Sequence, residues 1–266
     1  EKGVNGMKKF LAVLCSLATL ACGVAAFSAC GVKDPVPEGG GYALKIGYTQ
    51  MEPMNYFDES GKLIGFETEF AEKVCGELGY TPEFIDIDWN TKETSLKAGE
   101  IDLIWNGMTI TPELQAEFLI TDSYMDNQQV VIVKTENADK FKTIADLANA
   151  ASIAYESGSA AAKLIEGDEN LSSVTKVSCP AQKDAFFEVY TGASEVGVVD
   201  VTMARAMTAE GKDYHGALSY TDVGYAAEQY GIAMRKIDTV LCTKLNELIA
   251  KYKTDGTFDA LVEKYF

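Results

Sequence analysis

The feature of this sequence that most constrains its fold is a regular alternation of short apolar segments with longer segments of helical periodicity. Residues 43–48 form a short apolar run, and four apolar residues then recur at intervals of four from Phe66 to Leu78, just before Gly79. Apolar spacing of this kind predicts an amphipathic helix, and a glycine after the last apolar residue is typical of a helix end. The chain therefore begins with a strand that is followed by a helix.

The same alternation continues to the C-terminus. Further strands are predicted at 83–87, 101–105, 129–134, 152–155, 174–178, 196–199 and 230–234. Helices are predicted around 94–98, from Thr111-Pro112-Glu113, from Thr143, from Gly158, at 180–190, from Val201, at 239–252 and at 257–265. Alternating strands and helices predict mainly parallel sheets flanked by helices, and two rounds of the pattern predict two α/β lobes. Ligands of such folds bind beyond the carboxyl ends of the strands, where loops meet helix N-termini.

Composition and charge exclude several classes of protein. The 266 residues are 47% hydrophobic, which is enough for one large or two modest cores without disulfides. Forty acidic against 23 basic residues give a net charge of −17, which argues against nucleic-acid binding because phosphates require a basic face. Beyond Cys30 only Cys75, Cys179 and Cys242 remain, and with the single histidine, His215, they fit no zinc site. No metal is expected.

The N-terminal segment is typical of an exported protein. Two lysines follow Met7, and residues 11–27 are almost wholly apolar before the small residues that lead to Cys30. This pattern predicts a signal peptide over residues 1–29, of which residues 1–6 stand upstream of a plausible start at Met7. The rival interpretation is a membrane anchor, but the apolar stretch is shorter than the ~20 residues that a spanning helix needs.

Residues 27–30, Phe-Ser-Ala-Cys, also resemble the lipobox of bacterial lipoproteins, in which the cysteine is acylated after cleavage. Residues 30–41 are accordingly predicted to be a lipidated cysteine, Cys30, and a flexible tether rich in proline and glycine. Acyl chains on Cys30 would hold the protein on the outer face of the cytoplasmic membrane or in the periplasm. Simple cleavage and release is the alternative.

Several short motifs follow one another in a recognisable order. They are Ile64-Gly65-Phe66-Glu67, Ile101-Asp102-Leu103-Ile104, Gly107-Met108-Thr109-Ile110-Thr111-Pro112-Glu113, Ser157-Gly158-Ser159, Val198-Val199-Asp200, Tyr230-Gly231-Ile232-Ala233-Met234-Arg235-Lys236 and Asp255-Gly256-Thr257-Phe258. In this order they resemble the bacterial extracellular solute-binding proteins, family 3, of amino-acid ABC transporters. The resemblance covers residues 43–266, which is nearly all of the chain after the predicted signal peptide.

The resemblance implies a type II periplasmic-binding-protein fold, in which two lobes joined by two crossover strands close on a small molecule. Lobe one would comprise residues 42–134 plus 232–266 and lobe two residues 135–231, with hinges near Lys134 and Tyr230. The implied function is capture of an amino acid or related small nitrogenous solute and its delivery to a membrane permease with its ATPase. A monomer without enzyme activity and without cofactors is expected.

The resemblance also implies which polar residues meet the ligand. Thr109 and Gly107 match positions whose hydroxyl, amide and carbonyl groups contact it, and Asp200 matches the carboxylate that pairs with its ammonium. Ser159 and Ala160 stand at a helix start, where backbone amides would hold its carboxylate. Thr109 and Gly107 can also be interpreted as turn residues, and Asp200 as a helix cap.

Tyr48, Met51 and Trp89 match positions that enclose the ligand side chain, although each also fits ordinary core packing. Glu156 stands where a neutral or cationic side chain often points into the cleft. A cleft with Glu156 and Asp200 and without a compensating cation would be acidic.

One position departs from the family pattern. Leu114 replaces the arginine that grips the α-carboxylate of the ligand, and the two arginines of the chain, Arg205 and Arg235, lie outside this loop. Two hypotheses follow: an α-amino acid binds weakly through the helix start at Ser159, or the ligand is a cationic species held by ion pairing and by the ring of Trp89. A degenerate protein that binds nothing well is the third possibility.

Other functions are known on this kind of fold. A ligand-sensing domain of a signalling system is one alternative, and a periplasmic dehydratase-type enzyme is another. The chain contains no G-x-S-x-G motif and no metal-binding spacing, and His215 falls in a polar stretch typical of a loop. The sequence therefore favours a free-standing transporter subunit.

Overall fold

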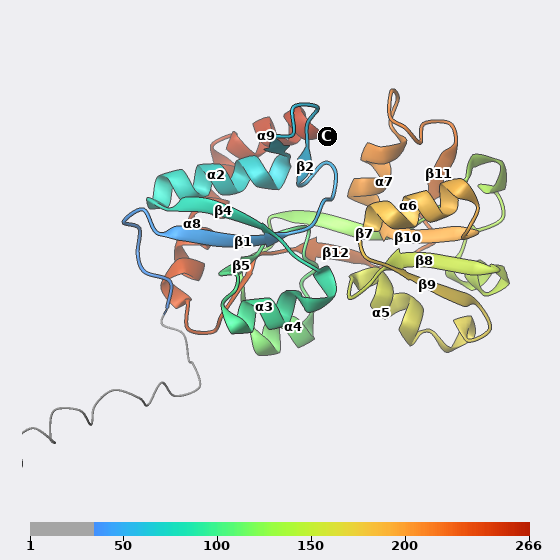
Figure 1. Cartoon of the computed structure of the whole chain (residues 1–266), viewed down its shortest axis with the longest axis horizontal. Coiled ribbons are helices and arrows are strands. Elements are labelled where there is room, and N and C mark those ends of the chain that lie inside the picture. Colours follow the sequence, from blue (N-terminus) through green and yellow to red (C-terminus); the bar gives the residue numbers. More distant parts are fainter. Residues whose placement is uncertain (1–34) are drawn as a thin grey trace, which may run out of the picture. The chain divides into compact units, whose positions relative to one another are not determined.

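The structure, a computed structural model, describes residues 35–266, which form two α/β lobes (Figure 1). The predicted signal peptide, the predicted lipidation site Cys30 and residues 31–34 of the predicted tether lie outside the described residues. None of the helices that the structure describes has the length and hydrophobicity needed to cross a membrane.

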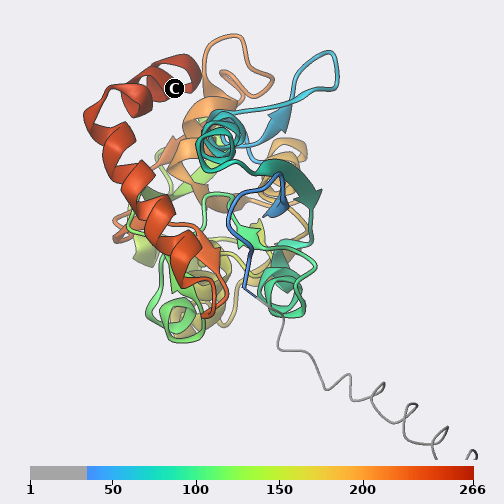
Figure 2. The same cartoon turned by 90° about the vertical axis from the view of Figure 1, so that its left-hand side faces the viewer.

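Lobe one is built on a five-stranded sheet in the order β4-β1-β5-β13-β6. Its strands are β1 (Ala43–Tyr48), β4 (Thr81–Asp86), β5 (Leu103–Ile104), β6 (Leu119–Ile120) and β13 (Ala233–Met234). Its helices are α2 (Phe66–Leu78), α3 (Lys92–Ala98), α4 (Pro112–Glu117), α8 (Thr239–Thr254) and α9 (Thr257–Tyr265), with a 3₁₀ turn η1 (Trp89–Thr91). A small hairpin, β2 (Tyr56–Phe57) and β3 (Leu63–Ile64), precedes α2. Figure 1 shows α2 and α3 on opposite sides of the sheet, and in Figure 2 α8 and α9 (red) extend along this lobe, where both pack against α2.

Lobe two is built on a six-stranded sheet in the order β11-β7-β10-β8-β9, with β12 paired to β7. Its strands are β7 (Met125–Lys134), β8 (Ser152–Glu156), β9 (Thr175–Cys179), β10 (Val196–Asp200), β11 (Leu218–Thr221) and β12 (Ala227–Tyr230). Its α-helices are α5 (Ala160–Gly167), α6 (Gln182–Thr191) and α7 (Val201–Thr208), with 3₁₀ turns η2 (Thr135–Asn137), η3 (Ile144–Asn149) and η4 (Glu169–Leu171). In Figure 1, α6 and α7 lie on one side of this sheet and α5 lies on the other.

The lobes are connected by β7 and β12, which pair antiparallel between Met125–Gln128 and Ala227–Tyr230. The far end of β7 lies inside the second sheet, where Lys134 pairs with Leu218. The hinge predicted near Lys134 is therefore misplaced, because the strand crosses between the lobes before that point. The predicted lobe boundaries, 42–134 plus 232–266 and 135–231, stay a prediction.

The two-lobed α/β class is confirmed, and the pairing adds that both sheets are mixed. Strands joined through helices are parallel, as in β4-β1-β5 and β10-β8-β9, whereas the strands that pass between the lobes add antiparallel pairs. The strand predicted at 230–234 is two strands, β12 and β13, because the chain changes lobes at Gly231 and Ile232. The hairpin β2-β3 and the strands β6 and β11 were not predicted.

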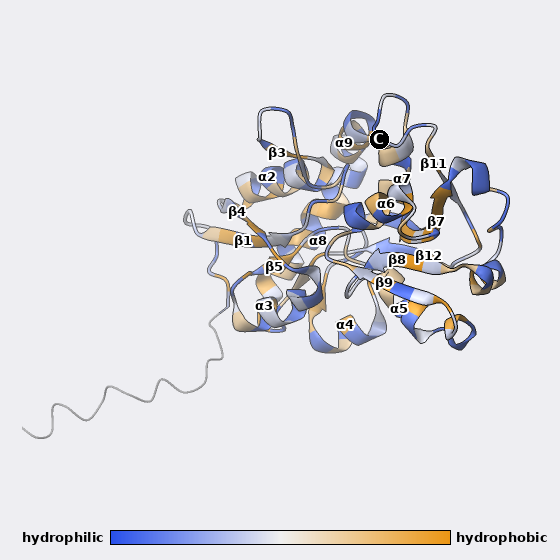
Figure 3. Ribbon diagram, turned by 45° about the vertical axis from the view of Figure 1, so that its right-hand side comes forward, coloured by the Kyte–Doolittle hydropathy of each residue, from blue (hydrophilic) through white to orange (hydrophobic). Residues whose placement is uncertain are grey.

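Apolar residues (orange in Figure 3) follow strands such as β1 and β7 between the covering helices. In lobe one the core contains a group of aromatic rings, in which Phe70 lies 4.8 Å from Trp105 and 5.1 Å from Phe258 between ring centroids. Cys75 is buried in the same core. The three cysteines that the structure describes are all free thiols.

Candidate functional site

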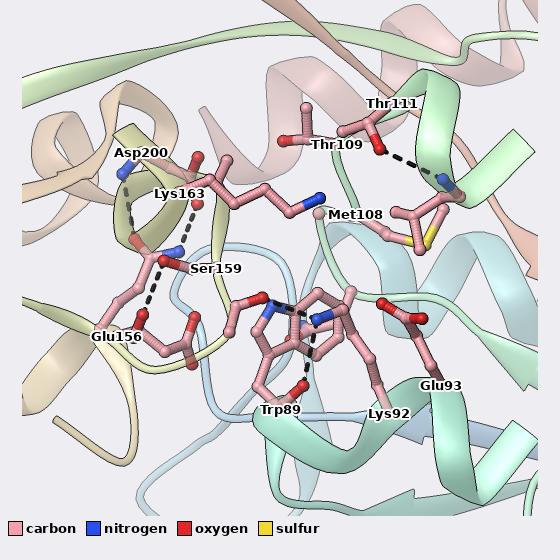
Figure 4. A pocket seen from close by; sticks show the side chains of 16 residues that line it. Trp89, Lys92, Glu93, Met108, Thr109, Thr111, Glu156, Ser159, Lys163 and Asp200 are labelled. Atoms are coloured by element: carbon pink, nitrogen blue, oxygen red, sulfur yellow. Dashed lines mark hydrogen bonds between the residues drawn. The ribbon is translucent and has the colours of Figure 1, made fainter. Parts of the chain in front are cut away.

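A cavity lies between the two lobes, where β8 and β10 end and the loop after β5 begins (Figure 4). It contains about 500 Å³ of space with its open mouth included. Lobe one contributes Trp89, Lys92, Glu93, Asn106, Gly107, Met108, Thr109, Thr111 and Leu114. Lobe two contributes Glu156, Gly158, Ser159, Ala160, Lys163, Gln182 and Asp200.

Seven of the nine predicted ligand-contacting residues line this cavity: Trp89, Gly107, Thr109, Glu156, Ser159, Ala160 and Asp200. Tyr48 and Met51 do not line it. Tyr48 is buried in lobe one with its ring centroid 6.1 Å from that of Phe84. Met51 is buried behind Gly107, where a Cβ on the glycine would lie 3.1 Å from the methionine sulfur. These two side chains pack behind the wall of the cavity.

Asp200 ends β10 and is surrounded by side-chain amides. Its Oδ1 accepts hydrogen bonds from Asn127 Nδ2 and from Gln129 Nε2 (2.6 Å), and its Oδ2 accepts one from Gln182 Nε2. Burial and the neighbouring Glu228 carboxylate raise the pKa of Asp200 to about 6, while the three amides act to lower it. Such a carboxyl group still ionises near neutral pH, and it suits a cationic partner inside a closed cavity.

The alternative role of Asp200, as a cap for the helix that starts at Val201, is not what the structure shows. Asp200 occupies the N-cap position of α7, but its side chain makes no capping hydrogen bond. Its oxygens are turned instead to the amides at the cavity.

Two of these amides, those of Asn127 and Gln129, belong to the crossover strand β7 and were not predicted from the sequence. Asn127 Nδ2 and Gln129 Nε2 also donate to Glu228 Oε2 on β12, at 3.1 and 3.0 Å, and Thr109 Oγ1 donates to the same oxygen at 3.1 Å. One polar network therefore joins Thr109 of lobe one to Asp200 of lobe two through both crossover strands. One feature of the sequence could have indicated this pair. Asn127 and Gln129 are two positions apart, and residues at i and i+2 of a strand face the same side.

Glu156 ends β8, the strand next to β10. It is 3% exposed, and its Oε1 has no hydrogen-bond partner among the described residues. Burial and the Asp200 carboxylate raise the pKa of Glu156 to about 8, while Lys92 acts in the opposite direction. Since buried polar atoms are nearly always hydrogen-bonded, an oxygen in this state at a cavity wall is suited to accept from a bound molecule.

Lys92 is a further residue that the sequence analysis missed. Its Nζ donates to the carbonyl oxygens of Trp89 (3.2 Å) and Gly158 (2.7 Å), and it lies 4.8 Å from the centroid of the Trp89 ring. Burial lowers the pKa of Lys92 to about 8. The bond to Gly158 connects lobe one to lobe two, and the protein's own lysine occupies a cation–π position at the tryptophan.

The loop that carries Gly107 is held from behind by Glu67. Gly107 N donates to Glu67 Oε1 (2.8 Å), Tyr124 Oη donates to the same oxygen, and Asn55 Nδ2 donates to Oε2 (2.8 Å). Burial raises the pKa of Glu67 to about 7. Gly107 has a φ of +53°, a conformation that favours glycine. The acid of the Ile64–Glu67 motif is thus a support for the cavity wall.

Ser159 stands at the start of helix α5, as the sequence predicted, and its side chain caps the helix. Its Oγ accepts from Ala162 N (3.1 Å) and donates to the carbonyl oxygen of Glu156 (2.7 Å). The hydroxyl is therefore occupied, and what the helix start offers the cavity is its backbone amides from Ala160 onward. The first amides of a helix have no acceptor within the helix, and they favour an anion.

Leu114 is buried beside Met108, so lobe one presents an apolar wall where the family pattern has an arginine. Arg235 does not replace that arginine, because it pairs with Asp102 at 2.9 Å and Asp238 at 3.1 Å in the interior of lobe one. The structure thus agrees with the sequence on two points: Leu114 stands at the position of the family arginine, and Arg235 does not take over its role.

Arg205 lines a different cavity, together with Tyr56 and Lys212. His215 is exposed, with Nδ1 3.2 Å from the carbonyl oxygen of Thr208, as expected of a loop residue. Within residues 35–266, no group of His, Cys, Asp and Glu side chains is arranged to hold a metal ion.

The charge of the cavity differs from the acidic site that the sequence indicated. Three acidic side chains, Glu93, Glu156 and Asp200, line it, but so do two lysines, Lys92 and Lys163. Lys92 and Lys163 come from separate helices, and no local sequence pattern brings them to one cavity. The site therefore offers both charges to a bound molecule.

Two lobes, two crossing strands and a cavity between the lobes with charged groups of both signs define a binding protein for a small polar solute. The model of the bacterial extracellular solute-binding proteins, family 3, matches residues 44–266. The chain belongs to this family.

Individual relatives extend over most of the chain. It is 29% identical to the amino-acid-binding protein AabA of Dichelobacter nodosus over 97% of this chain and 96% of that protein. An ancestral arginine-binding protein solved with bound arginine superimposes with a TM-score of 0.78 at 29% identity, covering 84% of this chain and 98% of that one. An ancestral amino-acid-binding protein described as a precursor of cyclohexadienyl dehydratase superimposes with a TM-score of 0.76 at 30% identity, covering 84% and 95%.

Proposed function

We propose that this protein is the extracytoplasmic substrate-binding subunit of an ABC importer, which captures an amino acid between its lobes and delivers it to a membrane permease with its ATPase. The observation that carries the proposal is the cavity itself. Both lobes line it, and its central carboxylate, Asp200, is hydrogen-bonded to the crossover strand β7. A ligand at Asp200 therefore acts at the place where the lobes are joined.

The polar groups suit the two ends of an α-amino acid. The ammonium group binds Asp200, with the hydroxyl of Thr109 and the carbonyl of Gly107 on the opposite side. The carboxylate lies at the start of α5, beside the amides at Ser159 and Ala160.

Of the ligand classes that the sequence left open, the structure supports an α-amino acid over a purely cationic species. Lys92 and Lys163 bring positive charge to the lining, and Lys92 already lies over the ring of Trp89. The oxygen of Glu156 without a partner favours a ligand side chain that donates a hydrogen bond or carries a positive charge. The relative solved with arginine has a ligand of that kind.

Closure of the lobes is the proposed response to the ligand. Contacts across the cleft include Lys92 Nζ to the carbonyl of Gly158 at 2.7 Å and Lys212 Nζ to the carboxylate of Glu52 at 2.5 Å. A ligand shifts the lobes toward closure only to the extent that it binds the closed form better. The closed form is then what the permease recognises.

We further propose that the protein is exported, anchored through acylated Cys30, and works as a monomer without cofactor, metal, nucleic acid or catalysis. The signal-like segment at residues 7–30 supports export and anchoring. A ligand-sensing domain and a dehydratase-type enzyme remain the alternatives, and the relationship to a dehydratase precursor makes the second one specific.

Isothermal titration of the purified protein with the twenty standard amino acids, cystine, putrescine and spermidine tests the function. We expect at least one amino acid to bind with a micromolar or lower Kd and to be recovered unchanged by NMR. Tight binding of a polyamine alone would replace the amino-acid proposal, and conversion of the bound solute would favour the enzyme. Absence of any binding would contradict the proposal.

A further inference from the structure

A positive charge from lobe two reaches the place where lobe one lacks an arginine. Lys163 lies in the first turn of α5 and lines the cavity, and Figure 4 shows its side chain extended toward Thr109 and Met108. Its Nζ is 3.9 Å from Oε2 of Glu113, which is the residue immediately before Leu114. The ammonium group of Lys163 therefore lies near the start of α4, although it comes from the opposite lobe.

The two lysines that line the cavity differ in how many of their N–H donors already have a hydrogen-bond acceptor. The ammonium group of Lys92 donates to two carbonyl oxygens, at 3.2 and 2.7 Å. For Lys163, the Glu113 carboxylate is the one ion-pair partner among residues 35–266, and 3.9 Å is longer than a normal hydrogen bond. An ammonium group has three donors, so Lys163 keeps more of them for a ligand anion than Lys92 does.

We propose that Lys163, together with the first backbone amides of α5, binds the carboxylate of the amino-acid ligand in place of an arginine from lobe one. This inference rests on the proposed function, because it assigns one end of an amino acid to a residue. The helix start and the ammonium group act on the same side, since both belong to α5, and both favour an anion.

The proposal assigns different ligand contacts to the two lobes. Both charged contacts of the ligand, Asp200 for the ammonium and Lys163 for the carboxylate, come from lobe two. Lobe one then supplies Thr109 and the apolar side chain of Leu114 when the cleft closes, while its Lys92 stays bonded to the carbonyl oxygens of Trp89 and Gly158. The carboxylate of Glu113 gives up its contact with Lys163 when the ligand enters.

The experiment compares Lys163→Met with Lys142→Met. Lys142 is a matched control, because it lies elsewhere in lobe two, its side chain is 54% exposed against 55% for Lys163, and each forms an exposed ion pair. The probes are the tightest-binding standard amino acid and its α-carboxamide, which lacks the negative charge. Titration calorimetry gives the Kd values, and thermal unfolding verifies that both variants fold.

We expect Lys163→Met to weaken binding of the amino acid about 10- to 100-fold, the effect of losing a charge-assisted contact, and to change binding of the carboxamide less than about threefold. Lys142→Met should leave both unchanged, and Lys163→Arg should retain most of the affinity. Equal losses for acid and carboxamide, or no greater loss than in Lys142→Met, would overturn the role of Lys163 alone. If the unaltered protein binds no amino acid, the proposed function fails and this inference falls with it.

Discussion

Two buried glutamates, one in each lobe, differ in how their oxygens are used: Glu156 lines the cavity, and Glu67 lies behind its wall. Glu67 of lobe one accepts three hydrogen bonds, from Gly107, Tyr124 and Asn55. Glu156 of lobe two has an oxygen with no partner among the described residues, although both side chains are at most 3% exposed. The comparison separates a carboxylate that supports the fold from one that is left open for a ligand.

The same division extends to the surrounding walls. Glu67 of lobe one supports the cavity wall from behind, whereas Asp200, Glu156 and Lys163 of lobe two line the cavity. Removal of the supporting Glu67 should therefore lower stability, and substitutions of the three lining residues should lower affinity. Each of the following experiments tests that separation.

Glu67→Ala should lower the free energy of unfolding by about 3–4 kcal/mol, because it leaves several buried donors without an acceptor. Urea denaturation measures the loss. Glu156→Ala is the matched variant and should cost less than about 1 kcal/mol, since its carboxyl group is desolvated without full compensation. Similar losses in both variants would remove the distinction between the two glutamates.

Asp200→Asn should weaken ligand binding at least 100-fold, which corresponds to about 2.7 kcal/mol, because the ion pair with the ammonium group is lost. Titration calorimetry checks this with the best-binding amino acid. Asp126→Asn, at an exposed position of the neighbouring strand β7, is the control and should bind normally. An Asp200→Asn protein that retains its affinity would show that the ligand lies elsewhere.

Gly158→Ala should weaken ligand binding about tenfold, or about 1.4 kcal/mol, by holding the lobes apart. A Cβ at this position would lie 2.8 Å from the Cα of Asn90 in the other lobe, at a φ of +68°. Gly211→Ala has a comparable φ of +82° but meets nothing within 4 Å, so it imposes the backbone strain alone. Small-angle scattering with ligand should show less compaction for Gly158→Ala than for the control.

The free energy of unfolding of the ligand-free protein should fall as the pH rises from 5.5 to 7.5. The folded-state pKa values of Asp200, Glu67 and Glu156 are raised to about 6, 7 and 8, so the folded protein binds more protons than the unfolded chain in this range. Lys92, whose pKa is lowered to about 8, acts in the opposite direction only above that pH.

Glu156→Gln should reduce this slope by about 1 kcal/mol per pH unit, because one carboxyl group no longer titrates. Urea denaturation at pH 5.5, 6.5 and 7.5 provides the comparison. A stability that is constant or rises over this range in the unaltered protein would contradict the assignment of raised pKa values.

The parts of the fold that were predicted correctly are those encoded by neighbouring residues. The helix over Phe66–Leu78 with Gly79 at its end and the helix starts at Thr111 and Ser159 all depend on contacts within a few positions. The elements that were missed, such as the split of 230–234 into β12 and β13, depend on where the chain changes lobes. Local periodicity carries no information about that point.

The site shows the same limit. Seven cavity residues were predicted from the family resemblance, whereas Tyr48 and Met51, which were also predicted, do not line the cavity. Glu228, which accepts a hydrogen bond from Thr109, was not predicted. Glu228 meets Thr109 across a separation of 119 residues, and no local pattern reports such a contact.

By itself the sequence determined the α/β alternation, the two helix starts at the cavity, the family and the absence of an arginine at position 114, where Leu114 stands. Only the tertiary structure decided which charges meet there, because Lys92 and Lys163 reach the cavity from helices of different lobes. The physical reason is the distance along the chain between the residues that determine each feature. Helix starts and strand periodicity depend on adjacent side chains, whereas the charge of a cleft is the sum over residues that only folding brings together.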